Sequence, residues 1–339
     1  MGLIYDLSTK YKTLSIVGMS KNAGKTTALN YFIEEADDEC IRLGITSTGR
    51  DGETSDLVTG TEKPRVYLYE DTIVSVPHQL YEMADAGLEI LEMTRMGTAI
   101  GELMLCRVAD SGYVQIAGPV ATADTKKLCG KMLDMGAELI MIDGAIDRKS
   151  IASPETSDAI ILSTGAVLSR RMDKVVEETG HIVNLYSLPE LPEENIRELL
   201  VSDGAEDHVV IIDKHDHARR LDLTTGLGAS KYIDDAISED DRYVYIPGAF
   251  TNSVIADIQL PKLRQVRFIL KDPTRIFIDS VRWRQLCKRG FTVNVLKNIE
   301  IAAVTVNPYS PSGYSFEHKA LRDAMQEAIP DIPVIDVRL

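Results

Sequence analysis

Short apolar runs alternate with stretches of helical spacing along the first half of the chain. Such alternation is typical of a parallel β-sheet whose strands are joined by crossover helices, so we expect an α/β fold with a mainly parallel sheet. The clearest pair is a buried strand at Leu14–Gly18 and a helix from about Lys25 to Glu35. The pattern also predicts strands at Gly44–Ser47, Val114–Ala117, Leu139–Asp143 and Ala159–Ser163, and helices at Thr98–Val108, Asp124–Met135 and Ser169–Thr179.

An acidic segment with two prolines, Pro189–Asp207, interrupts this pattern and is the expected boundary. The sequence therefore predicts one domain over residues 1–190 and a second α/β unit over residues 207–339, although the second half could instead extend the first sheet. Strands are expected in it at Val209–Asp213, Tyr243–Ile246, Val266–Leu270, Thr292–Leu296 and Ala302–Asn307, followed by a helix at Phe316–Glu327.

Composition narrows the class of protein. A length of 339 residues favours two domains over one. The formal net charge of −15 disfavours a general nucleic-acid binder and a binder of anionic membranes, since both need positive fields. The chain lacks an apolar run near the ~18 residues of a membrane span, and its N-terminus lacks the apolar core of a signal peptide. We expect a cytoplasmic protein whose four scattered cysteines are mostly buried thiols.

The most informative motif is GMSKNAGKTT, residues 18–27, which directly follows the first strand and opens the first helix. This context is what a phosphate-binding P-loop requires. Its backbone N–H groups would surround the phosphates at a helix N-terminus, with Lys25 at the β- and γ-phosphates and Thr26 on Mg²⁺. The sequence thus predicts binding and hydrolysis of ATP with Mg²⁺. The expected nucleotide contacts are Gly18, Asn22, Ala23, Gly24, Lys25, Thr26 and Thr27.

The spacing of this motif departs from the usual one. Five residues separate Gly18 from Gly24 instead of four, and Met19 stands where the first glycine normally falls. The longer loop resembles that of dethiobiotin synthetase-like ATPases, in the class that includes nitrogenase iron protein-like switches. Those switches often carry a second lysine where this chain has Ser20, so we assign no trans-acting role to Lys21.

Acidic residues at the ends of two other strands are candidates for the metal side of the site. Asp143 ends the apolar run 139–143, where P-loop proteins place an acid that holds Mg²⁺, although a single acid can also simply end a strand. Asp51 and Glu53 follow the strand at residues 44–47 and could face the metal or activate water. The Asp51–Gly52 pair is also a common turn signal, so a solvated turn stays open. Weaker candidates are Thr48 and Arg50 for phosphate contact, and Asp147 and Arg148 for sensing phosphate or positioning water.

Several other features carry less chemistry. The loops at residues 117–124 and 163–167 follow expected strands and could line the site, since ligands in open α/β sheets bind at strand carboxyl ends. Asp124 could equally be a helix N-cap. The pair His215 and His217 favours a polar loop over a metal site, and Trp283 favours a packed amphipathic helix over a partner contact.

Four stretches together, GMSKNAGKTT, ITSTGRDGE, IDGAIDRKS and VTVNPYSPSGYSF, resemble the ATPase-like subunit of the lysine 5,6-aminomutase reactivases. The resemblance implies an ATP- and Mg²⁺-dependent molecular chaperone that reactivates an adenosylcobalamin-dependent aminomutase by promoting exchange of damaged cobalamin. It implies two partners, the aminomutase and a companion reactivase subunit, and a homodimer is a further arrangement left open. The sequence lacks the cobalamin-binding DxHxxG pattern, so we expect the chain to act on the holoenzyme, with the second half as the natural place for partner contact.

Three other functions stay open, one of which is a non-catalytic nucleotide-sensing scaffold. A dethiobiotin synthetase-like ligase or kinase would act on a small molecule beside the γ-phosphate, and a GTPase-like protein would serve as a cofactor or metal chaperone. A clear NKxD guanine signature is missing, and Asn307, at the end of the strand Ala302–Asn307, could contact the base as asparagine does in related ATPases. These two features favour ATP over GTP.

Overall fold

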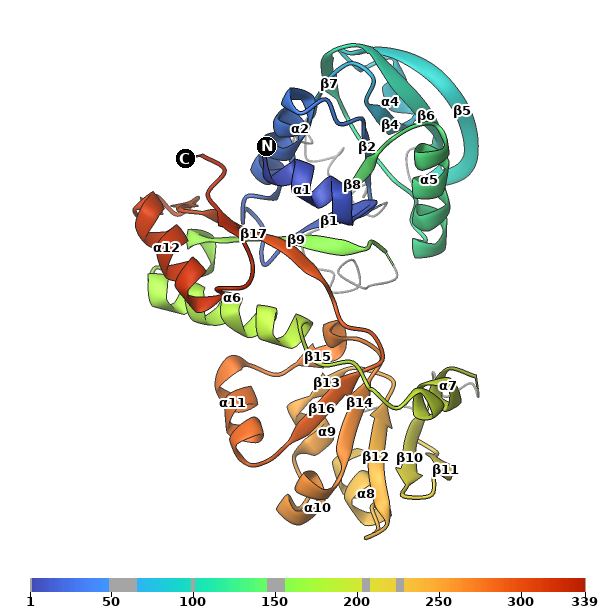
Figure 1. The fold of residues 1–339 in the computed structure, drawn as a ribbon, viewed down its shortest axis with the longest axis vertical. Helices are drawn as coiled ribbons and strands as arrows, with labels where there is room; N and C mark the ends of the chain where they lie inside the picture. Colours follow the sequence, from blue (N-terminus) through green and yellow to red (C-terminus); the bar gives the residue numbers. More distant parts are fainter. Residues whose placement is uncertain are drawn as a thin grey trace. The chain divides into compact units, whose positions relative to one another are not determined.

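The computed structural model describes residues 2–48, 66–98, 101–144, 156–202, 208–223 and 229–338. The chain divides into two compact units (Figure 1). Unit 1 contains Met1–Thr179 together with Glu300–Leu339, and unit 2 contains Gly180–Ile299. The helix α6 (Met172–Tyr186) spans the boundary along the chain.

A large, mostly parallel sheet forms the centre of unit 1. Within its described residues the strands run in the order β20-β17-β9-β1-β8-β2-β4-β6-β5. Neighbours from β20 through β4 are parallel, whereas β6 pairs antiparallel with both β4 and β5. Their bounds are β1 (Thr13–Gly18), β2 (Leu43–Ser47), β4 (Ile73–Pro77), β5 (Gly87–Thr98), β6 (Gly101–Asp110), β8 (Leu139–Asp143), β9 (Ala159–Gly165), β17 (Ile301–Asn307) and β20 (Val334–Ile335).

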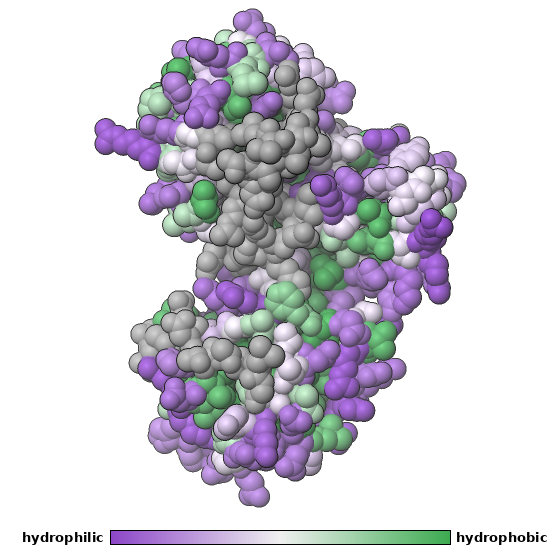
Figure 2. Space-filling view, turned by 180° about the vertical axis from the view of Figure 1, so that it is seen from behind, coloured by the Kyte–Doolittle hydropathy of each residue, from purple (hydrophilic) through white to green (hydrophobic). Residues whose placement is uncertain are grey.

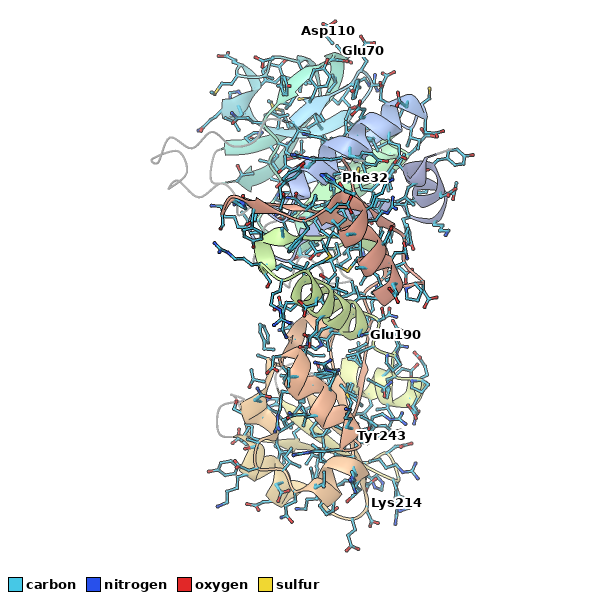
Figure 3. All side chains as sticks on the ribbon, turned by 90° about the vertical axis from the view of Figure 1, so that its left-hand side faces the viewer. Phe32, Glu70, Asp110, Glu190, Lys214 and Tyr243 are labelled. Carbon is cyan, nitrogen blue, oxygen red and sulfur yellow. The ribbon has the colours of Figure 1, made fainter. Side chains whose placement is uncertain are left out.

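Helices cover both faces of this sheet. The strand β8 shows why: Leu139 and Met141 join the core beneath α1 (Leu3–Lys10) and α2 (Lys25–Asp38), while Ile140 and Ile142 join the core beneath α5 (Thr122–Asp134). Strands buried on both faces read as continuous apolar runs, as the central strands here do. Figure 3 labels Phe32, which is fully buried in α2. The remaining elements of unit 1 are β3 (Val66–Leu68), α4 (His78–Tyr81), β7 (Gly112–Val114), η2 (Ala166–Leu168), β18 (Tyr309–Ser310), β19 (Tyr314–Ser315) and α12 (His318–Ala328).

Unit 2 has its own smaller sheet. Its described residues give the strand order β11-β10-β12-β14-β16, in which β12, β14 and β16 are parallel and β10 is antiparallel to both of its neighbours. Phe250, Phe268, Phe291 and Trp283 pack their rings against one another in its core. Its elements are α7 (Glu194–Ser202), β10 (Val209–Asp213), β11 (Ala218–Leu221), α8 (Ala229–Ala236), β12 (Asp241–Ile246), β13 (Phe250–Thr251), α9 (Asn252–Ile255), α10 (Leu260–Gln265), β14 (Arg267–Leu270), η4 (Pro273–Arg275), β15 (Ile276–Phe277), α11 (Ser280–Lys288) and β16 (Thr292–Val295).

Two sequence predictions of local structure are wrong. The expected helix at Thr98–Val108 is largely the strand β6, and of the expected strand at Val114–Ala117 only Val114 belongs to a strand, β7. The apolar run in β6 is buried where it pairs with β4 and β5, and periodicity alone cannot separate such a run from a buried helix. Pairing with the preceding strand β5 on one side and with β4 on the other therefore decided the outcome.

The expected division at residues 190 and 207 also needs correction. Residues 300–339 return to unit 1, because β17 pairs with β9 and β20 pairs with β17. The expected linker Pro189–Asp207 lies within unit 2, where its α7 contributes buried Ile196 and Leu200 to the core. A strand's apolar pattern shows that it is buried but not which sheet buries it. The alternative that the second half extends the first sheet holds only for residues 300–339, which contribute β17 and β20.

The four cysteines follow only in part the expectation that they are mostly buried thiols. Cys106 and Cys129 are buried, and burial raises their thiol pKa values to about 11 and about 12, but Cys40 and Cys287 are exposed. Hydrophilic residues predominate on the face of the molecule drawn in Figure 2. None of the helices in the described ranges combines the length and the apolar character that a bilayer span requires.

Candidate functional site

The segment Gly18–Thr27 contains the end of β1, a tight turn over residues 19–24 and the first turn of α2, at the carboxyl end of a central strand; we call it the 18–27 loop. Asn22 (φ 63°) and Gly24 (φ 102°) both adopt left-handed backbone conformations within it. Ala23 is buried, and its N–H donates to the Ser20 carbonyl over 3.3 Å. Left-handed residues in such a turn point successive N–H groups toward one concave side, which is a common anion-binding arrangement.

The helix α2 begins directly after Gly24. Its N-cap residue, Gly24, has no side chain that could accept a hydrogen bond from the first turn, as the serine, threonine, aspartate or asparagine usual at this position would. The partial positive charge of a 14-residue helix is concentrated at this end. The first turn of α2 is therefore suited to a bound anion.

Lys25, the first residue of α2, extends across the end of β1 to the neighbouring strand. Its Nζ donates to the carbonyl oxygen of Gly144, the residue after β8, and the Gly144 N–H donates to Ile16 over 3.1 Å. A Cβ on Gly18 would lie 2.9 Å from the Lys25 side chain, so the glycine lets the lysine pass along the strand end. Gly18 lies one position farther from Gly24 than the first glycine of the usual motif does. It therefore has a steric role here, because it leaves room for the Lys25 side chain.

Strand register aligns the other expected residues along one edge of the sheet. Asp143 lies opposite Ile16 of β1 and opposite Ser47 of β2. On the other side of β1, Gly18 lies opposite Ser163 of β9, and the Met19 N–H donates to the Ser163 carbonyl over 2.9 Å. The 18–27 loop, Ser47 and Asp143 therefore share one edge, as ligand sites in open α/β sheets do.

Asp143 is half-buried and sits at the centre of the candidate metal side. Its backbone carbonyl accepts hydrogen bonds from Ser47 Oγ (3.2 Å) and from the N–H of Thr48 (3.1 Å), which ties the ends of β2 and β8 together. Thr26 and Thr27 are half-buried in the first turn of α2. A threonine hydroxyl and a carboxylate are ligands that Mg²⁺ accepts, with waters and phosphate oxygens completing its shell. Thr26 and Asp143 could hold the metal.

The other candidate residues of these loops lie in parts of the chain that the structure does not describe. Arg50, Asp51 and Glu53, as well as Asp147 and Arg148, lie outside the described residues. Within the described ranges, no group of three or more His, Cys, Asp or Glu side chains could hold a metal ion by itself. Among the residues that the structure describes, Thr26 and Asp143 are the candidates for holding a metal at this edge.

Asn307, at the end of β17, contacts the 18–27 loop directly. Its Nδ2 donates to the carbonyl oxygen of Asn22 over 3.4 Å, and a Cβ on Gly24 would lie 3.0 Å from the Asn307 Cβ. A small pocket opens beside this contact, lined by residues of α2, of β17 and of the segment after β20. The lining includes Gly24, Thr27, Asn307, Pro308, Asp336 and Arg338.

Sequence reasoning missed the last part of this pocket. Asp336 and Arg338 follow β20, a strand of two residues that is too short to give a pattern. Only the pairing of β20 with β17 brings them beside the loop. Ser163 was missed as a loop anchor, although the loop 163–167 was expected near the site.

The two further loops do pack at strand ends. A Cβ on Gly165 would lie 2.1 Å from the Asn307 carbonyl oxygen, and a Cβ on Gly118 would lie 1.6 Å from that of Ser47. These glycines are required by close backbone approach. The alternative role of Asp124 as an N-cap is wrong, because α5 begins at Thr122 and Asp124 pairs with Lys127 inside its first turn.

The polar loop predicted around His215 and His217 and the packed helix predicted around Trp283 are both confirmed. Residues 214–217 form a polar turn in which Asp213 accepts hydrogen bonds from the N–H groups of His215 and His217. Trp283 is buried on α11, where its ring packs against Phe291 at 5.7 Å.

Comparisons of this chain with protein-family models, with curated proteins and with solved structures gave no match.

Proposed function

We propose that this protein binds ATP and Mg²⁺ at the 18–27 loop, acting as a P-loop, and hydrolyses the nucleotide. The observation that carries the proposal is the path of Lys25, which runs from the uncapped first turn of α2 to the residue after Asp143. A cation, a helix N-terminus and an acid at adjacent strand ends are the parts that phosphoryl transfer uses.

Each residue has a distinct part in this chemistry. The N–H groups of the loop and of the first turn of α2 bind the α- and β-phosphates, and Lys25 neutralises charge on the β- and γ-phosphates. Thr26 and Asp143 hold Mg²⁺, which supplies further charge neutralisation at the transferring phosphate. Asn307 lies at the base end, beside Gly24 and the small pocket.

The test is nucleotide binding by Lys25→Ala. We expect ATP affinity to fall by at least about 100-fold, because the charge-assisted contacts of Lys25 with the phosphates are lost. Isothermal titration with Mg·ATP measures the affinity, and circular dichroism shows that the variant folds. Lys126→Ala, which removes an exposed lysine from α5, is the matched control and should bind ATP as the wild type does. Unchanged affinity in a folded Lys25→Ala protein would refute the proposal.

We further propose that hydrolysis drives a protein switch that reactivates an adenosylcobalamin-dependent aminomutase, with unit 2 as the partner-binding part and the cytoplasm as the location. The support is the resemblance of four stretches, whose described portions meet at this one edge. Lys25 contacts Gly144, Asn307 contacts Asn22, and Ser47 lies opposite Asp143. Motifs that are distant in sequence but join in one site are expected of a functional signature.

The partner proposal has its own experiment. Inactivated aminomutase is mixed with this protein, the companion subunit, ATP, Mg²⁺ and fresh adenosylcobalamin, and its activity is followed. Activity should return with ATP and not with Lys25→Ala, because the partner must bind the ATP and ADP states with different affinities. Equal recovery without nucleotide, or none with every component present, overturns the chaperone proposal and leaves the ATP site intact.

A further inference from the structure

Met19, where the usual motif has its first glycine, has a side chain that reaches from the 18–27 loop to a helix. Its N–H donates to the Ser163 carbonyl at the end of β9, and its Sδ lies 3.4 Å from the Thr179 hydroxyl oxygen of α6. A thioether is a weak hydrogen-bond acceptor on a flexible, apolar chain, which suits such a contact. A glycine at this position would leave the loop without any side-chain contact to α6.

Thr179 is held in place by buried partners of its own. Its side chain and that of Thr164 in β9 are both fully buried, and their hydroxyl oxygens lie 2.8 Å apart. The Thr179 hydroxyl oxygen also lies 2.8 Å from the Val175 carbonyl oxygen, one helical turn earlier. These partners satisfy a buried hydroxyl, so moving Thr179 would break them at a cost in free energy. Thr179 therefore gives Met19 a fixed point of contact on α6.

The helix α6 carries this contact to the place where the chain passes from one unit to the next. Thr179 is the last residue of unit 1 before the boundary, and Gly180 is the first residue of unit 2. Beyond the boundary α6 is attached within unit 2, where the His181 Nε2 lies 3.0 Å from the Ile278 carbonyl oxygen. The residue that Met19 contacts thus adjoins the boundary.

Gly180 makes α6 easier to open at this point. A glycine inside a helix costs about 1 kcal/mol relative to alanine. Among the described residues, none would lie within 4 Å of a Cβ at Gly180, so crowding does not require the glycine. Helix amides exchange with solvent through local opening, and contacts on the neighbouring residues oppose that opening. The contact between Met19 and Thr179 is one of these.

We propose that Met19 couples the nucleotide state of the 18–27 loop to α6: a bound nucleotide fixes the loop, and the contact with Thr179 then suppresses the opening of α6 at the unit boundary. The proposal rests on the proposed nucleotide function of this loop and names the element through which the proposed switch acts. A ligand shifts an equilibrium only through contacts that differ between the two states. Here the loop is that difference, because phosphates hold its backbone only in the bound state.

Hydrogen exchange of the full chain, followed by mass spectrometry on peptides that cover residues 172–186, tests the coupling. Exchange is compared without nucleotide and with saturating Mg²⁺ and AMP-PNP, an ATP analogue that is not hydrolysed. In the wild type the α6 amides should exchange at least about fivefold more slowly with nucleotide, the lower end of typical coupling between sites. In Met19→Ala, also at saturation, the slowing should fall below about twofold, because the loop no longer reaches Thr179.

Three further variants sharpen the result. Thr179→Ala removes the same contact from the helix side and should also lose the slowing, which keeps the test available if Met19→Ala does not fold. Met19→Leu keeps apolar bulk against Thr179 and should keep most of the slowing. Met96→Ala is the matched control: it shortens a half-buried methionine of β5 in the same unit and should respond as the wild type does. The ratio of the two exchange rates is compared, so a general loosening of α6 does not imitate the effect.

The outcomes separate this proposal from the nucleotide function. Calorimetric titration first establishes binding. A wild type that binds no nucleotide overturns the nucleotide function and the coupling with it. A wild type that binds nucleotide without slower exchange in α6, or a folded Met19→Ala protein with the full wild-type slowing, overturns the coupling alone.

Discussion

The carboxyl ends of the parallel strands differ sharply between the two units. In unit 1, β1 is followed by a loop with two left-handed residues and by a helix whose first turn has no described side-chain cap. In unit 2, Asp272 follows β14 and accepts the Thr274 N–H over 2.9 Å, and Asp279 caps α11 by accepting the Arg282 N–H over 2.9 Å. The N–H of Arg282 also holds the pKa of Asp279 below its ordinary value.

The same contrast holds beyond β16 of unit 2. The Leu296 carbonyl accepts from Arg197 Nη2 over 3.0 Å, and the Asn298 N–H donates to Glu190, labelled in Figure 3, over 3.1 Å. In unit 2, side chains of the same unit hydrogen-bond to the backbone groups at the strand ends. In unit 1, glycines and backbone N–H groups surround Lys25 instead. Strand ends whose backbone groups are hydrogen-bonded by nearby side chains are suited to a structural role. Strand ends at which N–H donors cluster are suited to binding an anionic ligand.

The largest effect should follow from changing Asp143, the acid at the strand ends beside the 18–27 loop. Asp143→Asn should leave ATP binding measurable but reduce Mg²⁺-dependent hydrolysis by about 100-fold or more, because oriented metal contributes several kcal/mol to the transition state. Phosphate release under single-turnover conditions measures this. Asp158→Asn is the matched control: Asp158 accepts the N–H groups of Lys12 and Thr13 at the opposite end of the same sheet. Wild-type hydrolysis by Asp143→Asn would make Asp143 only a strand terminator.

The sequence predicted the strand ends around the 18–27 loop of unit 1 better than the strand ends of unit 2. The strand Leu139–Asp143 has the predicted bounds, and Lys25 begins α2 as expected, because a P-loop motif combines strand, turn and helix signals within ten residues. The pairing of β17 with β9 joins residues more than 130 positions apart, and β20 then pairs with β17; no local pattern specifies either pairing. For this reason the domain boundary and the place of Asp336 were not predictable, although β17 itself was.

A smaller effect, confined to unit 2, is expected at Asp241, whose side chain is buried. Arg219 contacts both of its oxygens, with Nη1 2.7 Å from Oδ1, and the Ser238 N–H donates to it over 2.7 Å. Asp241→Asn leaves Arg219 without its charge partner, so the opening free energy of unit 2 should fall by about 2–3 kcal/mol. Native-state hydrogen exchange in β10 and β12 measures this. The neighbouring Asp240→Asn, on the surface, should change nothing measurable.

This prediction carries a pH dependence. Burial alone would raise the pKa of Asp241, but hydrogen bonds from Arg219 and Ser238 outweigh it and place the pKa below its ordinary value of 3.8. A lowered folded-state pKa adds stability at pH above 3.8, and that stability is lost as the pH falls through the folded value. The difference between wild type and Asp241→Asn should therefore be full at pH 7 and shrink on acidification below about pH 4. ATP affinity at pH 7 should be the same in both proteins.

The smallest effect tests the comparison most directly, because it makes one exchange, glycine to alanine, in a segment that follows a parallel strand in each unit. Gly24 has a φ of 102° and would place a Cβ 3.0 Å from the Asn307 Cβ, whereas Gly248, after β12, has a φ outside the left-handed region and open space around it. Gly24→Ala should destabilise unit 1 by about 1–2 kcal/mol, and shifted loop N–H groups should weaken ATP binding about tenfold. Gly248→Ala should leave both properties unchanged or slightly raise stability by restricting the unfolded chain. Calorimetric titration and urea unfolding of both variants give the answer. Equal effects at the two glycines would mean that the 18–27 loop is no more constrained than an ordinary turn, and the contrast between the two edges would lose its physical basis.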